Sequence, residues 1–196
     1  MKLQGDTSAI TAPGQFVNIK LDGLFLRRPI SVCNKEGDTL TIIYKVVGDG
    51  THAMAHMSAG QTLDILTGLG NGFDTSVSGN KPLLVAGGSG VPMMYALAKQ
   101  LVAEGKEVSA VLGYRTASDV FLARAIEMLG VKVVITTEDG SVGVKGFVTD
   151  AMKDMDYTYF YTCGPEPMLK AVYKATKTAG QMSFEERMGC GFGACM

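Results

Sequence analysis

Two cysteines near the end of the chain carry its most specific chemical pattern. Cys190 and Cys195 are separated by four residues, two of which are glycines. This spacing matches the first half of the plant-type iron–sulfur pattern C-x4-C-x2-C…C, whose third position would fall just beyond Met196. Glycine suits such a loop because the backbone must adopt unusual angles and bring its amides close to the sulfurs. Two thiolates cannot close a four-thiolate site, so a tail with two spare thiols explains this segment equally well.

A glycine-rich turn, Gly87-Gly88-Ser89-Gly90, is a second candidate site. It follows a short apolar run at 83–86 and precedes Pro92, a residue typical of the first turn of a helix. Such a turn lets backbone amides approach a pyrophosphate, and the helix N-terminus adds partial positive charge. It is not the G-x-G-x-x-G fingerprint of ordinary dehydrogenases. The alternative is a tight strand-to-helix turn that binds no ligand.

A third candidate, Cys163-Gly164-Pro165, also lies between an apolar run and a helical pattern. In a parallel sheet it would face the same crevice, outside the carboxyl ends of the strands. Cys163 is either a buried thiol, the commoner fate of a lone cysteine, or part of a reactive site.

The N-terminal half offers weaker signals. An arginine followed by a hydroxyl, as in Arg28-Pro29-Ile30-Ser31, suits phosphate oxygens, although Arg27 and Arg28 could simply be a basic surface pair. Ile43-Tyr44-Lys45 could supply a stacking ring and a cation, and Gly50-Thr51 a phosphate-binding turn. Taken alone, each is more simply part of a strand and a hairpin.

His52 and His56 are four residues apart and could share a helical face as metal ligands. No third ligand lies nearby in the sequence, so we favour an exposed or capping role for both histidines.

These candidates must be positioned by two kinds of element. Short runs rich in Val, Ile and Thr predict strands at 15–21, 31–35, 39–46 and 62–66, and strands without intervening helices favour a small antiparallel β-barrel. From residue 83 strands alternate with helices, which predicts a doubly wound parallel sheet. Its strands are expected at 83–86, 108–112, 131–136 and 157–162. Its helices are expected from Pro92, from a cap at Ser118 to Gly130, and at 165–179.

The predicted fold is therefore an α/β chain of two domains with a tail. The barrel domain covers 1–78, the nucleotide-type domain 79–181, and the start of a cluster-binding segment 182–196. The composition, with 46% apolar and 19% charged residues, is that of a globular protein and not of a disordered one. A net charge of −1 offers no basic field for nucleic acid, and no apolar run approaches the roughly 20 residues that span a membrane. Four scattered cysteines and the lack of a signal peptide favour a reducing cytoplasm.

Together these motifs give the chain a specific resemblance. It resembles the ferredoxin–NADP reductase superfamily and, within it, the electron-transfer subunits of NAD-linked dihydroorotate dehydrogenases. The resemblance covers nearly the whole chain, and the order of the motifs is more specific than any one of them. The matching segments are Ala12–Phe16, Arg28–Ser31, Ile43–Lys45, Gly50-Thr51, Gly68–Phe73, Gly87–Pro92, Asp139–Ser141, Cys163–Pro165 and Glu186–Cys195.

The resemblance implies FAD, NAD and a [2Fe–2S] cluster as cofactors. Arg28, Pro29, Ile30 and Ser31 match the motif whose arginine meets the FAD pyrophosphate and whose serine lies near the flavin. The other FAD-contacting stretches match Ile43, Tyr44, Lys45, Gly50 and Thr51. The NAD-side loops match Gly87, Gly88, Ser89 and Gly90 and also Cys163, Gly164 and Pro165, which puts Cys163 near the meeting of nicotinamide and flavin. Cys190 and Cys195 match the first two cluster ligands.

The resemblance also implies a partner and a direction of electron flow. In the family, an FMN-containing catalytic subunit oxidises dihydroorotate, and electrons reach NAD+ through the cluster and FAD, in a heterotetramer. Hydride transfer needs no side-chain acid–base pair, and we expect no catalytic residue of that kind. The family barrel has a further strand before the segment at Met1, and two cluster ligands are missing before Met196. We therefore expect truncated ends and an incomplete ligand set.

Three alternatives stay open at this point. Other NAD(P)H-linked flavin and iron–sulfur reductases, of the sulfide dehydrogenase or NADH–ferredoxin transhydrogenase type, tend to carry a carboxylate where this chain has Cys190. An assembly subunit could keep the fold without its cofactors. NADP could replace NAD, because Arg115 at the end of the second strand of the parallel sheet could attract a 2′-phosphate. We follow the family and expect NAD.

Overall fold

The computed structural model describes residues 1–186 and 188–194, which form two compact units. One unit contains residues 1–72 together with 186–196, and the other contains residues 73–185. The C-terminal segment thus returns to the N-terminal unit. The domain boundaries predicted from the sequence, after residues 78 and 181, describe which cofactor each part is expected to bind. They stay a prediction. Cys195 lies outside the described residues.

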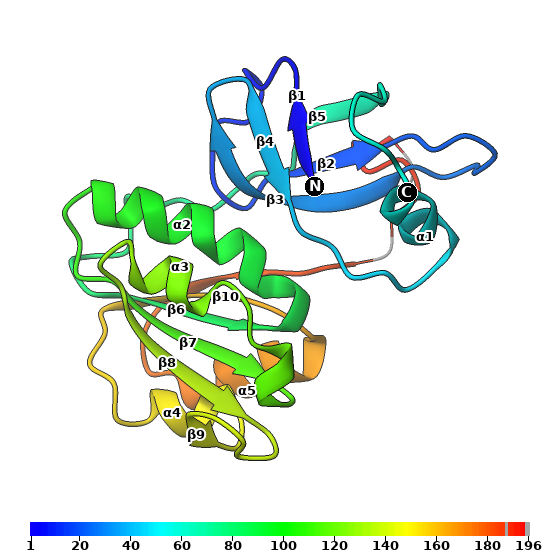
Figure 1. The fold of residues 1–196 in the computed structure, drawn as a ribbon. Helices are drawn as coiled ribbons and strands as arrows, with labels where there is room; N and C mark the ends of the chain where they lie inside the picture. The colour runs from blue at the N-terminus through cyan, green and yellow to red at the C-terminus, as the bar shows by residue number, and fades with distance from the viewer. Residues whose placement is uncertain (187, 195–196) are drawn as a thin grey trace. The chain divides into compact units, whose positions relative to one another are not determined.

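The first unit is an antiparallel half-barrel of five strands in the order β1-β4-β3-β2-β5 (Figure 1). Alternating residues of β2 and its neighbours, such as Val17 and Ile19, are fully buried in one apolar cluster. The short helix α1 closes this cluster with Met54. The elements are β1 (Lys2–Gln4), β2 (Phe16–Ile19), β3 (Arg28–Glu36), β4 (Thr39–Ile42), α1 (Asp49–Ala55) and β5 (Ile65–Leu69).

The second unit is a parallel sheet of six strands in the order β11-β10-β6-β7-β8-β9. Its strands are β6 (Pro82–Gly87), β7 (Ser109–Tyr114), β8 (Lys132–Thr137), β9 (Val144–Lys145), β10 (Tyr159–Cys163) and β11 (Gly180–Ser183). Its helices are η1 (Gly88–Gly90), α2 (Val91–Ala103), η2 (Ala117–Asp119), α3 (Ala123–Glu127), α4 (Val148–Met152) and α5 (Glu166–Ala175).

Helices cover both faces of this sheet, as Figure 1 shows for α2 and α3 on one side and α4 and α5 on the other. Every residue of β6 is buried, and the strand divides its side chains between two cores. Leu84 and Ala86 join the cluster formed with α2 and α3, whereas Leu83 and Val85 join the cluster formed with α4 and α5. A strand that is buried on both faces has a continuous apolar sequence. This arrangement confirms the prediction of a doubly wound sheet.

Some predicted elements begin or end elsewhere. The strand expected at 39–46 stops at Ile42, where its pairing with Val32 ends. Gly50 and Thr51 lie in helix α1 rather than in a hairpin, because Thr51 Oγ1 accepts a hydrogen bond of 3.2 Å from the Gly48 N–H.

The helix expected from Ser118 begins only at Ala123. Asp119 accepts a hydrogen bond of 3.2 Å from the Thr116 N–H and so closes a separate single turn. Leu122 then adopts a left-handed φ of 60°, which separates that turn from α3.

A partly buried polar cluster fastens the segment that leads into the parallel sheet. The Lys106 ammonium donates to the carbonyl of Thr75 and, at 2.9 Å, to Ser78 Oγ, and it pairs with Glu104 at 2.8 Å. Thr75 Oγ1 donates to Glu104 Oε1 at 2.6 Å, and Gln100 donates to the same oxygen at 3.0 Å. Burial alone would raise the pKa of Glu104, but these hydrogen bonds and the Lys106 charge outweigh it and lower the pKa to about 2.

We expect this cluster to make the second unit sensitive to acid. A carboxylate whose pKa is lowered on folding stabilises the folded state above its usual pKa of 4.5, and this contribution is lost as the pH falls toward about 2. Glu104→Gln should therefore lower the free energy of unfolding by about 1 kcal/mol near neutral pH, a figure reduced for the partial exposure of the carboxylate. Urea titrations near neutral pH and at about pH 3 should show the deficit shrink. A deficit of equal size at both pH values would contradict the assignment.

Candidate functional site

The parallel sheet has one topological switch point, between β6 and β10. After β6 the chain passes through α2 to β7 on one side, whereas after β10 it passes through α5 to β11 on the other side. In open α/β sheets ligands bind at such a point, outside the carboxyl ends of the strands. β6 ends at Gly87 and β10 at Cys163, so the sheet brings together the glycine turn and the Cys163-Gly164-Pro165 turn.

The two turns touch through their backbones. A Cβ at Gly90 would collide with the carbonyl of Cys163 and lie 2.9 Å from the Gly164 nitrogen. A Cβ at Gly87 would lie 2.7 Å from the Met168 sulfur. Gly88, by contrast, is exposed with a left-handed φ of 53°, and a Cβ there would meet nothing within 4 Å. Gly87 and Gly90 therefore allow close packing, whereas Gly88 shapes an open turn.

Glu185 connects these turns to the segment after β11. Its carboxylate accepts a hydrogen bond of 3.2 Å from Ser89 Oγ and a longer one of 3.8 Å from Cys163 Sγ. The Cys163 thiol is fully buried, and burial, followed by the charge of Glu185, raises its pKa to about 12. The thiol therefore stays protonated near neutral pH and can donate. Sequence reasoning missed Glu185, because it assigned all of 182–196 to the cluster-binding tail.

The loop after β7 is held by polar side chains of the loop after β8. Ser141 Oγ accepts a hydrogen bond of 2.7 Å from the Ala117 N–H and donates one of 2.6 Å to Asp139 Oδ1. Arg115, the residue considered for NADP, is exposed and makes no ion pair among the residues that the structure describes. Asp139-Gly140-Ser141 thus supports the edge of the crevice beside Arg115.

In the half-barrel the two neighbouring arginines have different surroundings. Arg27 forms an ion pair of 3.0 Å with Asp64, which lowers the pKa of that carboxyl through its hydrogen bonds. Arg28 has no carboxylate partner in the described part of the chain, and its side chain lies directly over Gly50, where a Cβ would be 2.8 Å from Arg28 Cδ. The structure therefore distinguishes an arginine paired with a carboxylate from one whose Nη1 donates to the main-chain carbonyls of Leu26 and Arg27.

The remaining predicted residues of this unit lie on β3, on the chain after β4 and in α1. Ser31 is within β3, where it pairs with Phe16 of β2, and Ile43 directly follows Ile42, the last residue of β4. Ile30 and Tyr44 both pack against the half-barrel core, and burial raises the pKa of the Tyr44 phenol.

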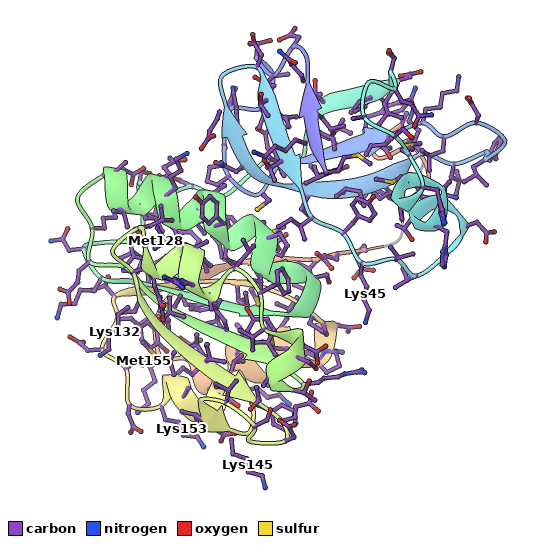
Figure 2. All side chains as sticks on the ribbon, viewed as in Figure 1. Lys45, Met128, Lys132, Lys145, Lys153 and Met155 are labelled. Atoms are coloured by element: carbon purple, nitrogen blue, oxygen red, sulfur yellow. The ribbon has the colours of Figure 1, made fainter. Side chains whose placement is uncertain are left out.

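Lys45, Thr51 and Pro29 are the remaining predicted site residues of this unit. Lys45 lies on the exposed stretch after β4 and points away from the half-barrel (Figure 2). The hydroxyl of Thr51 accepts a hydrogen bond of 2.9 Å from the Val47 N–H, so it holds the loop before α1. Pro29 is exposed on β3 beside Arg28.

The C-terminal segment is anchored to the half-barrel by Asn18, another residue that sequence reasoning missed. Asn18 is only 1% exposed on β2, and its Nδ2 donates a hydrogen bond of 2.9 Å to the carbonyl of Cys190. Its Oδ1 is buried and accepts no hydrogen bond within the described residues, a situation that costs roughly 1–3 kcal/mol. A polar residue between buried Val17 and Ile19 was the signal available in the sequence.

The described part of the C-terminal loop turns through two left-handed glycines. Gly191 and Gly193 adopt left-handed φ values of 76° and 84° on either side of Phe192. Cys190 is half-buried. No group of three or more His, Cys, Asp or Glu side chains within residues 1–186 and 188–194 could hold a metal ion. Of the two predicted cluster ligands, Cys190 lies within the described residues and Cys195 does not.

The two histidines do not form part of any such group. Both are exposed at the end of α1, and His56 Nδ1 makes a hydrogen bond of 2.8 Å with the carbonyl of His52. This contact is the capping role favoured above.

In the parts of the chain that the structure describes, no helix is both long and apolar enough to cross a membrane.

Comparison with known proteins adds two kinds of likeness. Residues 84–174 match a family model described as an oxidoreductase NAD-binding domain. Proteins named dihydroorotate dehydrogenase B (NAD(+)), electron transfer subunit, are similar over nearly the whole chain. The one from Geobacillus sp. (strain WCH70) is 44% identical and covers 95% of this chain and 76% of its own length. The one from Fusobacterium nucleatum is 42% identical, and the match covers 100% of this chain and 80% of the relative.

Solved structures share the fold. The chain is similar, with a TM-score of 0.85 and 30% identity over 96% of this chain and 71% of the other, to an NADH-dependent reduced ferredoxin–NADP oxidoreductase studied for flavin-based electron bifurcation. A ferredoxin reductase of carbazole 1,9a-dioxygenase has a TM-score of 0.75 at 26% identity, over 88% of this chain and 58% of its own.

The contact between the two turns yields a prediction about stability. Gly90→Ala should destabilise the second unit by more than about 2 kcal/mol, because its Cβ would collide with a backbone carbonyl that cannot move freely. Gly88→Ala is the matched control. It adds only the strain of a left-handed backbone and should lower the free energy of unfolding by about 1 kcal/mol. Urea unfolding of both variants measures the difference. Equal losses would show that the two turns can separate without cost.

Proposed function

The chain belongs to the family of dihydroorotate dehydrogenase B (NAD+) electron transfer subunits, and from this premise we propose that it carries electrons derived from dihydroorotate to NAD+. The observation that carries the proposal is identity of 44% over 95% of the chain, to a relative of which it covers 76%. The reaction belongs to pyrimidine biosynthesis. The function requires two nucleotide sites, and each unit carries candidate residues for one of them.

FAD is proposed to bind the half-barrel. Bound FAD exchanges a hydride with NAD+ and single electrons with an iron–sulfur cluster, so it connects two-electron to one-electron transfer. Arg28 is well suited to the pyrophosphate, because no carboxylate of the described residues neutralises its guanidinium and Gly50 leaves room for its side chain. Ser31 would lie beside the flavin, on the same strand. The other contacts are assigned to Pro29, Ile30, Ile43, Tyr44, Lys45, Gly50 and Thr51.

NAD is proposed to bind at the switch point between β6 and β10. The open turn at Gly88 and Ser89 can direct backbone N–H groups at a pyrophosphate, and α2, a helix of 13 residues, adds its positive N-terminus. The second wall consists of Cys163, Gly164 and Pro165. Glu185 holds Ser89 and the Cys163 thiol in place and thereby orients both walls.

A [2Fe–2S] cluster is proposed to bind the C-terminal segment. Cys190 and Cys195 would supply two thiolates, and the left-handed glycines 191 and 193 let the loop turn around the sulfurs. The fit of the described residues is limited to Cys190 and this backbone.

The partner is proposed to be an FMN-containing catalytic subunit, joined with this chain in a heterotetramer in the cytoplasm. The word subunit in the names of the relatives supports a partner of this kind. We assign NAD rather than NADP, because the relatives are named for NAD(+).

Reconstitution tests the function directly. The full-length protein, purified with its FMN-containing partner, should form NADH when dihydroorotate is added, and it should use NADP+ much less efficiently. A preparation that binds no flavin would overturn the electron-transfer assignment. A strong preference for NADP+ would overturn only the choice of NAD.

The FAD assignment predicts opposite behaviour for two neighbouring arginines. Arg28→Leu removes the guanidinium over Gly50 and should weaken FAD binding at least about tenfold, the loss expected for one charge-assisted contact to a phosphate. Arg27→Leu removes the ion pair with Asp64 and should lower stability while FAD binding stays within about threefold of wild type. Flavin absorbance retained after gel filtration measures both effects. Equal loss of flavin in the two variants would assign the effect to folding instead.

A further inference from the structure

Asn18 is the polar residue of β2, and its side-chain amide contacts the C-terminal segment. Successive residues of a strand point to opposite faces, so Val17 and Ile19 enter the core while Asn18 faces the other way. A side chain on that outer face would ordinarily be hydrated. Asn18 is nevertheless only 1% exposed, because residues of the C-terminal segment lie against it.

The contact is specific in both its chemistry and its fit. Asn18 Nδ2 donates to the Cys190 carbonyl at 2.9 Å, and this acceptor fixes which end of the amide faces the loop. A Cβ at Gly191 would lie 2.7 Å from the same nitrogen and 3.3 Å from the Met188 sulfur. Only glycine at 191 therefore lets the loop rest on the amide, and its φ of 76° also favours glycine.

The strand beneath this contact is itself braced. The Arg27 guanidinium donates to the carbonyl of Asn18 at 3.4 Å and to the carbonyl of Asp64 at 3.1 Å, while its ion pair holds Asp64 at 3.0 Å. β2 pairs with β3 on one side and with β5 on the other. Asn18 is thus a polar group on a rigid element, placed next to a loop that has no strand or helix of its own among residues 188–194.

We infer that Asn18 is a positioning residue for the cluster-binding loop: it fixes the main chain at Cys190 and so sets where the first thiolate lies on the half-barrel. A buried amide in an otherwise apolar strand, whose Oδ1 accepts no hydrogen bond from the described residues, is unfavourable for the sheet alone. An action of the amide on the loop explains why a polar side chain lies there. This inference rests on the proposed cluster site.

The test compares three variants of the full-length protein. Asn18→Leu has a similar volume but no donor, and Asn18→Asp replaces the donor by a carboxylate that repels the Cys190 carbonyl. Asn34→Asp is the matched control, since it makes the same change on β3, where the amide contacts Glu36 at 3.0 Å. Two rates are measured: the release of iron to a ferrous chelator in the presence of ascorbate as reductant, and the alkylation of Cys190 by iodoacetamide after iron has been removed, followed by peptide mass spectrometry.

Asn18→Asp should accelerate both rates at least about tenfold, as is usual when a partner in the outer shell of a metal site is lost, and Asn18→Leu should accelerate them at least about threefold. Asn34→Asp should match wild type. Cys33, which is 2% exposed and has its pKa raised to about 11 by burial, serves as an internal reference for the half-barrel. A positioning role predicts faster alkylation of Cys190 alone, whereas a general loss of folding would accelerate Cys33 as well.

The inference would be overturned if Cys190 were alkylated at the wild-type rate in both Asn18 variants. It would also be overturned if the alkylation of Cys33 were accelerated equally. A wild-type protein that holds no iron would instead refute the proposed cluster, and the alkylation of Cys190 would still decide the role of Asn18. The failure of the proposed function and the failure of this inference are therefore distinguishable.

Discussion

The close approach of two backbone turns is the constraint on which the parallel-sheet unit depends. β6 and β10 are neighbours, but the connections that follow them leave in opposite directions. Their carboxyl ends can lie side by side only if the turns after Gly87 and Cys163 are nearly free of side chains. Gly90 satisfies this condition, because any larger residue would collide with the carbonyl of Cys163. The two turns can thus lie together because a residue is small, and not because a charged group is present.

Polar side chains then secure the irregular segments that surround each site. Gln15 accepts hydrogen bonds of 2.7 Å and 3.0 Å from the N–H groups of Thr11 and Ala12, and its amide donates to Gly70 at 3.3 Å. Asn18 holds the Cys190 loop in a similar way, and Glu185 links Ser89 to Cys163. Such contacts matter because loops lack the repeated backbone hydrogen bonds of helices and strands.

Sequence reasoning succeeded where one local rule decides the structure. The buried run before Gly87 predicted β6, and alternation of strands and helices predicted the parallel sheet. It was wrong where two local signals competed. Ser118 is a good helix cap, yet Asp119 closes an earlier turn with Thr116, and Leu122 in a left-handed conformation delays the helix to Ala123. Short strands such as β9 and β11 gave too few residues for a pattern, because their pairing depends on distant strands.

By itself, the sequence determined the fold class, the turns that face the crevice and the spacing of Cys190 and Cys195, since each follows from the order of residues along the chain. Only the tertiary structure separated Arg27, paired with Asp64, from Arg28, which lies over Gly50. Only the tertiary structure revealed Asn18 at Cys190 and Glu185 between Ser89 and Cys163. These contacts join residues far apart in the chain, and their energies depend on burial and distance, which no local pattern encodes.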